Sequence, residues 1–338
     1  MEEGNKLQGL SNECYLEGRP TGQSTNRLKY FPIMMYAIVM GLSGLTIMYQ
    51  KAGIWLNFPS FIGNTLMIID TLLFVFISIV YIVKIFKYPS MVKEEFLHPV
   101  RINFFAAVSI SMLMLAIIYK DVNHLMSGLF WYPGMLLHFY LTMYTIAFWI
   151  NRNQDINHSS PAWFIPIVGN VLVPIAGVDL VNHGILMYFF SSGIFFWIML
   201  FAILLNRIIF HNQIATKFMP TMFILIAPPA VGFIAYFAMF EKIDLFANML
   251  FNLALFFTFL LAFMYKSFIK IKFFLSWWAF VFPLAAMAIS SMLYYHHHQD
   301  SFLLLFSYLM IGVTTVVIAV VLYQTIIHIN RREICIEE

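Results

Sequence analysis

The placement of proline among ten consecutive apolar segments is the feature that most constrains this chain. The segments cover residues 31–50, 61–84, 99–119, 126–150, 163–180, 184–209, 220–240, 246–269, 274–295 and 301–328. Every odd-numbered segment has proline inside it or at its start, whereas the even-numbered segments lack proline except for Pro133 in the fourth. Proline inside a helix removes a backbone hydrogen bond, and in lipid that loss is tolerated only where protein or water replaces the bond. The pattern predicts an inner set of kinked helices that surrounds a pore, with straight helices outside it.

The amino-acid composition is typical of an integral membrane protein. The chain is 62% hydrophobic and 10% charged, whereas soluble domains carry about 25% charged residues. Each apolar segment has roughly the 20 residues that span a bilayer. The predicted fold is all-α, with ten transmembrane helices in one membrane domain over residues 31–328. A flexible cytoplasmic N-terminal tail is expected over residues 1–30, and a short cytoplasmic C-terminal tail over residues 329–338.

Positive charge predicts the orientation of the segments. Of the 19 lysines and arginines, all but Lys51, Lys120 and Lys242 fall on one side of the ten segments. The positive-inside rule places that side, and with it both termini, in the cytoplasm of a protein of the inner (cell) membrane. The segments then form five parallel hairpins that repeat about an axis normal to the membrane. The same bias explains the net charge of +3 without a nucleic-acid partner.

Small and polar residues are enriched in the odd-numbered segments. With the prolines they supply the candidate pore-lining or kink residues Gly41, Gly44, Asn103, Pro166, Gly169, Asn170, Pro174, Pro228, Pro229, Gly232 and Pro283. The helix N-termini would bring partial positive charge to the cytoplasmic mouth of a pore, where Arg101 adds a full charge. This arrangement favours anions, and the inner segments lack the acidic ring of a cation channel. The alternative is that the small residues only allow close helix packing.

Few side chains are suited to catalysis or metal binding. Asp70 is the one acid clearly at membrane depth, and it either couples transport to protons or hydrogen-bonds a neighbouring helix. The run His296–His298 is expected in a solvated exterior loop after the ninth segment. It is not interpreted as a metal site, because adjacent histidines on a helix or strand cannot converge on one metal ion. Other histidines, among them His138, are interpreted as lying near segment ends. Cys14 and Cys335 lack the spacing of a metal or redox motif. We expect no cofactor, no metal site and no enzyme activity.

The ninth segment contains an aromatic run that ends in proline, Trp277-Trp278-Ala279-Phe280-Val281-Phe282-Pro283. An aromatic ring beside the kink of an inner helix could project into a pore and close it as a hydrophobic constriction. The alternative is that the ring fills a gap between helices, because the chain contains 37 phenylalanines.

Five motifs on successive odd-numbered segments carry a family resemblance. They are Phe31-Pro32 with Met40-Gly41-Leu42, His98-Pro99-Val100-Arg101-Ile102-Asn103-Phe104, Trp163-Phe164-Ile165-Pro166-Ile167-Val168-Gly169-Asn170 with Pro174, Pro228-Pro229-Ala230-Val231-Gly232, and the aromatic run of the ninth segment. Over residues 30 to 328 the chain resembles the tellurite-resistance/dicarboxylate transporter family, which includes the plant slow-type guard-cell anion channels and their bacterial homologues.

The resemblance implies ten helices in five hairpins around a quasi-five-fold central pore, in a homotrimer with one pore per subunit. It implies a gating phenylalanine on the ninth helix, for which Phe282 is the best match and Phe280 the second. It also implies small inorganic or carboxylate anions as partners. The chain is therefore interpreted as an anion channel from a bacterium that conducts chloride or nitrate-like ions. The alternatives are a proton-coupled C4-dicarboxylate, sulfite or tellurite-related transporter and, in another class, a metal-dependent membrane enzyme that uses the histidine run.

Overall fold

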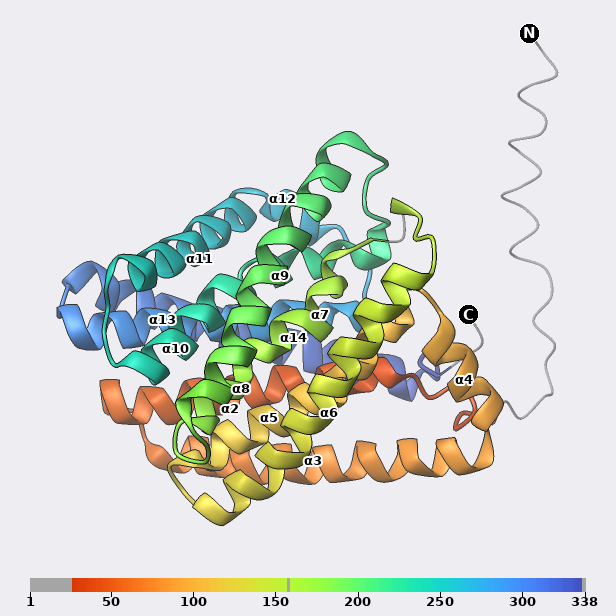
Figure 1. Cartoon of the computed structure of the whole chain (residues 1–338), viewed down its shortest axis with the longest axis horizontal. Helices are drawn as coiled ribbons and strands as arrows, with labels where there is room; N and C mark the ends of the chain where they lie inside the picture. Colours follow the sequence, from red (N-terminus) through yellow and green to blue (C-terminus); the bar gives the residue numbers. More distant parts are fainter. Residues whose placement is uncertain (1–25, 157–158, 336–338) are drawn as a thin grey trace, which may run out of the picture.

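The computed structural model describes residues 26–156 and 159–335, and within these ranges it contains helices and no strands (Figure 1). Five long helices are continuous: α3 (Ser60–Lys87), α6 (His124–Asn151), α9 (His183–Phe210), α11 (Leu245–Phe263) and α14 (Ser301–Asn330). Two short helices, α4 (Pro89–Leu97) and α12 (Tyr265–Ile269), lie in connections. The continuous helices correspond to the even-numbered apolar segments of the sequence.

The odd-numbered segments are composite, because each begins with a 3₁₀ helix and continues as an α-helix. The pairs are η1 (Ile33–Met35) with α2 (Tyr36–Leu56), η2 (Arg101–Phe105) with α5 (Ala106–Lys120), η6 (Thr216–Leu225) with α10 (Ala227–Phe240), and η7 (Leu275–Phe280) with α13 (Val281–His298). The fifth segment alternates twice, through η4 (Pro161–Phe164), α7 (Ile165–Val168), η5 (Gly169–Leu172) and α8 (Val173–Gly177).

The five candidate prolines of the odd-numbered segments lie in the first turn of an α-helix, just after these changes of helix type, whereas Pro220 lies inside η6. Pro166 and Pro174 are the second residues of α7 and α8, Pro228 and Pro229 are the second and third residues of α10, and Pro283 is the third residue of α13. The first-turn N–H groups of an α-helix have no partner within it, so proline is tolerated there. The expected proline kinks inside helices are therefore 3₁₀-to-α junctions. By contrast, Pro133 lies inside α6.

Helix contacts divide the segments into an inner and an outer set. Each composite segment packs against the continuous helix that follows it in the chain. The composite segments also contact one another in a closed order: α2 contacts α5, α5 contacts α8, α8 contacts α10, α10 contacts α13, and α13 contacts α2. We call this closed series the inner cycle.

Burial follows the same division. In the most apolar stretch of Leu275–His298, 78% of the residues are buried, compared with 22% in Ser60–Lys87. The continuous helices expose large apolar side chains such as Leu72, Phe76 and Leu305. In the described part of the chain eight helices are long and apolar enough to cross a membrane; α6 and the shorter apolar helix Pro161–Gly177 fall outside this set. The fold is that of a multi-pass membrane protein.

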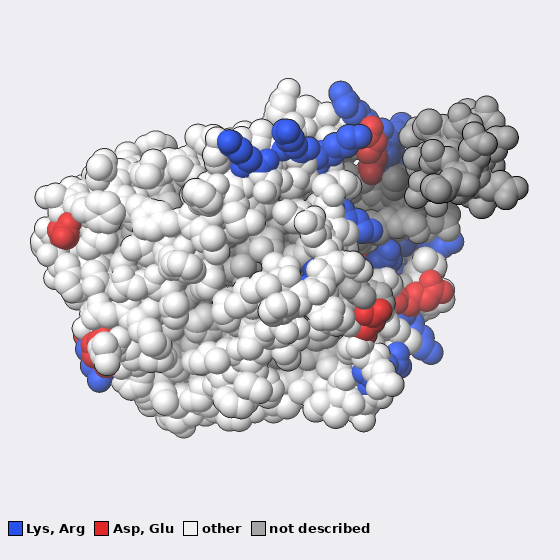
Figure 2. All heavy atoms as spheres, turned by 90° about the horizontal axis from the view of Figure 1, so that it is seen from above, with Lys and Arg blue, Asp and Glu red and all other residues white. Residues whose placement is uncertain are grey.

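Charged side chains gather at one end of the molecule. Figure 2 shows most of the visible lysines and arginines toward the end where α4 lies in Figure 1. Asn26, near the start of the described residues, donates a hydrogen bond to the Tyr88 hydroxyl beside α4. The prediction for residues 1–25, which includes Cys14, falls outside the described residues.

Two sequence expectations about histidines are wrong. His296–His298 form the last turn of α13 instead of a loop, because the helix continues until Gln299 takes a left-handed conformation with φ of 54°. His138 lies near the middle of α6 and is fully buried. The run is therefore helical instead of lying in an exterior loop, and His138 lies far from both ends of its segment.

Candidate functional site

A central cavity of about 70 Å³ lies within the inner cycle. All five composite segments contribute to its wall, for example through Met40 of α2, Ile110 of α5, Gly169 of η5, Val231 of α10 and Phe282 of α13. A volume of this size has room for a few water molecules. Because every member of the cycle reaches it, this cavity lies at the common centre of the odd-numbered segments.

The wall of the central cavity is apolar. None of the described residues that line it is charged, and Thr221 and Ser276 supply its side-chain hydroxyls. Thr221 donates its proton to the carbonyl of Phe218, and Ser276 donates to the carbonyl of Lys217. Neither proton is then directed to a ligand in the cavity. An ion that entered would lose water without gaining a charged or hydroxyl donor.

The two candidate gate residues have different environments. Phe282 lines the central cavity together with Pro283. A methyl group added at Gly44, one turn beyond Met40 on α2, would lie 3.5 Å from Phe282 Cδ2. The Phe282 side chain therefore lies beside Gly44. Phe280 is not among the lining residues; its ring packs against Phe223 at 4.7 Å and Phe268 at 6.1 Å.

The candidate glycines allow close approach of neighbouring side chains. A methyl group at Gly41 would lie 2.8 Å from Trp278 of the ninth segment, which neighbours the first in the inner cycle. A methyl group at Gly232 would lie 3.3 Å from Ile194 of α9. At Gly169 a methyl group would lie 2.2 Å from His138 of α6. Gly169 also lines the central cavity. Gly41 and Gly232 therefore fit the alternative that the small residues allow close helix packing. Gly169 allows close packing and also lines the cavity wall.

The candidate asparagines support the backbone. Asn103 donates to the carbonyl of Val100 at 3.1 Å, and Asn170 donates to the carbonyl of Ile167 at 2.8 Å and to the Thr142 hydroxyl at 3.0 Å. Thr142 in turn donates to the carbonyl of Pro166 at 2.7 Å. Neither asparagine lines the central cavity, and of the candidate prolines Pro283 does so whereas Pro166, Pro174, Pro228 and Pro229 do not.

Larger cavities lie at the two ends of the inner cycle. The cavity at the cation-rich end measures about 920 Å³ and is lined by Arg101, Lys272 and, near the two termini, Lys29 and Cys335. It shares Met34 and Leu275 with the central cavity, so the two adjoin. The cavity at the opposite end measures about 570 Å³ and shares no lining residue with the central cavity.

Buried polar contacts that the sequence did not reveal connect the segments. Glu95 of α4 accepts from Lys84 of α3 at 2.7 Å and from the backbone N–H of Ile33 at 2.7 Å, and both charged residues are buried. This carboxylate satisfies an unpaired N–H at the start of the first inner segment. His138 pairs through Nδ1 with the Ser109 hydroxyl at 2.8 Å. The available signals in the sequence were two opposite charges eleven residues apart, Lys84 and Glu95, and a histidine inside an apolar run.

Asp70 and the histidine run have structural partners. Ser43 of α2 donates to Asp70 Oδ2 at 2.6 Å, which confirms the hydrogen-bonding alternative for this acid. Asp70 does not line the central cavity. His296 stacks on Trp55 with ring centroids 6.0 Å apart. Within residues 26–156 and 159–335, no group of three His, Cys, Asp or Glu side chains could hold a metal ion.

An inner cycle of helices around an apolar cavity, with a wider cavity at each end, is the architecture of a membrane transport protein. The family model described as voltage-dependent anion channel matches residues 30–326. The chain belongs to this family.

Several relatives support this assignment. The chain is 30% identical to the S-type anion channel SLAH2 of Arabidopsis thaliana, over 95% of this chain and 64% of the relative. It is 28% identical to the uncharacterized transporter MJ0762 of Methanocaldococcus jannaschii, over 79% of this chain and 85% of the relative. It is 24% identical to the tellurite resistance protein TehA homolog of Haemophilus influenzae, over 79% of this chain and 82% of the relative.

These names bear on two expectations. The relatives are channels, transporters and a resistance protein, and family members are anion channels or transporters and not enzymes. The relatives come from a plant, an archaeon and a bacterium, so family membership does not assign the chain to a bacterial source.

Proposed function

We propose that this protein is an anion channel that conducts small monovalent anions, such as chloride and nitrate, along the axis of the inner cycle. The central cavity carries the proposal, because all five composite segments line it and wider cavities lie at both ends. Membership of an anion channel family supports the choice of ion. The whole protein's activity belongs to the proposal, since the chain spans 64% of the length of SLAH2.

The proposed architecture has ten membrane-spanning helices in five parallel hairpins around a quasi-five-fold pore. In addition to the eight helices that qualify by length and composition, α6 and the fifth segment would complete the set. Their packing against α5 and α9, respectively, supports this arrangement. The cation-rich end with both termini would face the cytoplasm of the cell membrane. A homotrimer with one pore per subunit in the bilayer is part of the same proposal.

Phe282 is the proposed gate. On α2 the lining of the central cavity ends at Met40, and Phe282 lies against Gly44 one turn farther on. Toward the opposite end the next cavity begins only at Lys51 on the same helix. A phenylalanine ring across this stretch would exclude water and ions as hydrophobic constrictions do. Phe280 serves as a matched control, because it belongs to the same aromatic run and packs away from the cavity.

The apolar wall suggests how the pore would select among anions. An anion in the central cavity gains no charged side chain and no hydroxyl donor in return for its lost water. The cost of dehydration would then set the order of permeation, because desolvation of a charge is expensive. Large, weakly hydrated anions should pass most easily. Nitrate is therefore expected to be more permeant than chloride.

The second candidate is a proton-coupled transporter for a C4-dicarboxylate, sulfite or a tellurite-related anion. Similarity to the tellurite resistance protein TehA homolog and the buried acid Asp70 favour it. However, the Asp70 carboxylate is bonded to Ser43 between α2 and α3 and lies outside the cavity lining. A coupling acid needs access to the transported ion. The channel therefore has the stronger support.

Flux from proteoliposomes separates the two candidates. Purified protein is reconstituted with chloride or nitrate inside, and efflux is followed with an ion-selective electrode while a potassium ionophore balances charge. A channel releases the anion whether or not a protonophore collapses the pH gradient. Flux that stops when the pH gradient is removed would refute the channel and support the carrier. Protein-free liposomes and liposomes with heat-unfolded protein are the controls.

A further inference from the structure

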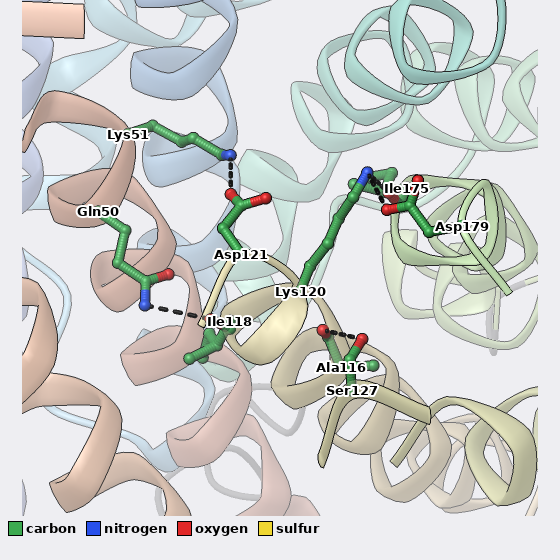
Figure 3. Close-up of polar contacts among 9 residues, drawn as sticks. All are labelled: Gln50, Lys51, Ala116, Ile118, Lys120, Asp121, Ser127, Ile175 and Asp179. Atoms are coloured by element: carbon green, nitrogen blue, oxygen red, sulfur yellow. Dashed lines mark hydrogen bonds and ion pairs between the residues drawn. The ribbon is translucent and has the colours of Figure 1, made fainter. Parts of the chain in front are cut away.

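Two lysines line the cavity at the end of the inner cycle opposite the cation-rich end. Lys51 lies near the end of α2, and Lys120 is the last residue of α5, so they come from neighbouring inner segments. Figure 3 shows the Lys51 side chain reaching Asp121 and the Lys120 side chain reaching Asp179 and Ile175. Their side chains are 24% and 22% exposed. Lys120 lies in the last turn of α5, where the partial negative charge of the helix C-terminus favours a cation.

Each lysine is paired with an aspartate that is more exposed than itself. Lys51 Nζ lies 2.8 Å from Asp121, and Lys120 Nζ lies 3.3 Å from Asp179. The two aspartates are 53% and 51% exposed. Ion pairs with exposed partners contribute little free energy, because water and salt screen them. An anion in the cavity can therefore compete with the aspartates for the ammonium groups.

The lysines also retain donors for a ligand. An ammonium group has three N–H donors. Among the described residues, Lys51 gives one hydrogen bond to Asp121, and Lys120 gives one to the carbonyl of Ile175 at 3.1 Å beside its contact with Asp179. Asp179 and Glu241 line the same cavity and oppose the positive charge. The balance between lysines and acids then sets how strongly this mouth attracts anions.

We propose that Lys51 and Lys120 form a binding site for small anions at this mouth, whose strength is reduced by the carboxylates of Asp121 and Asp179. The proposal rests on the proposed anion conduction and assigns one end of the path a charged entry site. It also explains the two cavity-lining cations at the end that is otherwise poor in positive charge. The ligand class is a small inorganic monovalent anion such as chloride, nitrate or iodide.

Single-charge variants test the site by the sign of their effects. In planar bilayers with anion added on this side, Lys51→Gln and Lys120→Gln should each lower the current about threefold at about 0.1 M salt, as expected for loss of one charge at about 6 Å in water. The deficit should shrink at about 1 M salt. Asp121→Asn and Asp179→Asn should raise the current, because they release a lysine from its carboxylate.

Lys242→Gln is the matched control. Lys242 is paired with Asp244 at 3.1 Å at the same end of the molecule, but it does not line the cavity. Its removal should leave the current unchanged. If the lysine–aspartate pairs only hold the helices together, Lys51→Gln and Asp121→Asn would change the current in the same direction. Effects of equal sign, or equal effects of Lys51→Gln and Lys242→Gln, would overturn the proposal.

Anion binding can be measured without conduction. Trp55 lines this cavity, and its ring lies 5.7 Å from Lys51 Nζ. The Trp55 emission is the difference in fluorescence between a protein and its Trp55→Phe variant. Iodide should quench this emission about threefold more strongly in the parent protein than in Lys51→Gln. Quenching by uncharged acrylamide should be the same in both. Equal iodide quenching would overturn the site whether or not the protein conducts. Absence of anion current with normal iodide quenching would instead count against the proposed channel.

Discussion

Replacement of Gly169 by alanine tests the packing of the central wall in atomic detail. The added methyl group would lie 2.2 Å from His138 Cε1, 2.4 Å from its Nε2 and 2.8 Å from Ile110 Cγ1. His138 is fully buried and held by Ser109, so the ring cannot turn away without losing that hydrogen bond. The backbone itself accepts alanine, because φ at Gly169 is −54°. The cost is therefore steric, and overpacking of this kind costs about 1–3 kcal/mol.

Thermal unfolding in detergent measures this cost. At about 2.1 cal/mol/K of unfolding entropy per residue, a cost of about 1–3 kcal/mol in a chain of 338 residues corresponds to a fall in Tm of about 1–4 °C. In a His138→Ala background the same Gly169→Ala change should cost much less, since the ring is gone and only the contact with Ile110 remains. Gly312→Ala is the control, because nothing lies within 4 Å of its added methyl and alanine is the better helix former. An unchanged Tm for Gly169→Ala, or an equal loss in both backgrounds, would refute the contact.

Two further predictions concern polar contacts near the helix ends. Glu95→Gln should destabilise the protein by about 3–5 kcal/mol, because it leaves buried Lys84 without its carboxylate. Chemical denaturation measures this loss, and adding Lys84→Met to the Glu95→Gln variant should recover part of it. The Tyr236 hydroxyl, which donates to Asp244 at 2.6 Å, and the Ala247 N–H lower the pKa of Asp244 to about 2 from its ordinary 3.8. The hydrogen bonds of the ionised Asp244 carboxylate therefore stabilise the folded protein, and this stabilisation is complete above pH about 4 and is lost as the pH falls through about 2. The Tm difference between the parent protein and Asp244→Ala should therefore narrow over that range, and a constant difference would contradict the pairing.

The sequence predicted the helical segments because apolar length and proline placement are local properties. Their ends were harder to predict. The first segment was expected to end at residue 50, but α2 continues to Leu56. Lys51 does not stop the helix, because its flexible side chain carries the charge to exposed Asp121. The helix ends at Asn57, whose φ of 58° leaves the helical region.

The histidine run shows how a polar sequence can continue a helix. His297 and His298 interact through Nδ1 with carbonyls four residues earlier, at 3.1 Å in each case. The His298 ring stacks on Tyr294 with centroids 4.2 Å apart. These contacts lie within one helix face, but the charge and polarity of the run resemble those of a loop. Composition alone therefore favoured the wrong element.

The candidate site depends on directions that the sequence does not encode locally. Phe280 ends η7, whereas Phe282 is the second residue of α13, and the two helix types rotate the chain by different angles per residue. Which ring meets the cavity therefore follows from where the 3₁₀ helix ends. The Glu95 contact with Ile33 and the His138 contact with Gly169 join residues 62 and 31 positions apart in the chain. No local pattern could have predicted either.

Current through Phe282→Ala tests the proposed gate most directly. The parent protein, Phe282→Ala and Phe280→Ala are purified, checked for equal assembly by size-exclusion chromatography, and recorded in planar bilayers under a chloride or nitrate gradient. Loss of the ring beside Gly44 should give a large steady anion current at voltages where the parent protein conducts little. Phe280→Ala should remain closed, because its ring packs against Phe223 and Phe268 outside the central cavity. Equal currents in the parent protein and Phe282→Ala would contradict the gate.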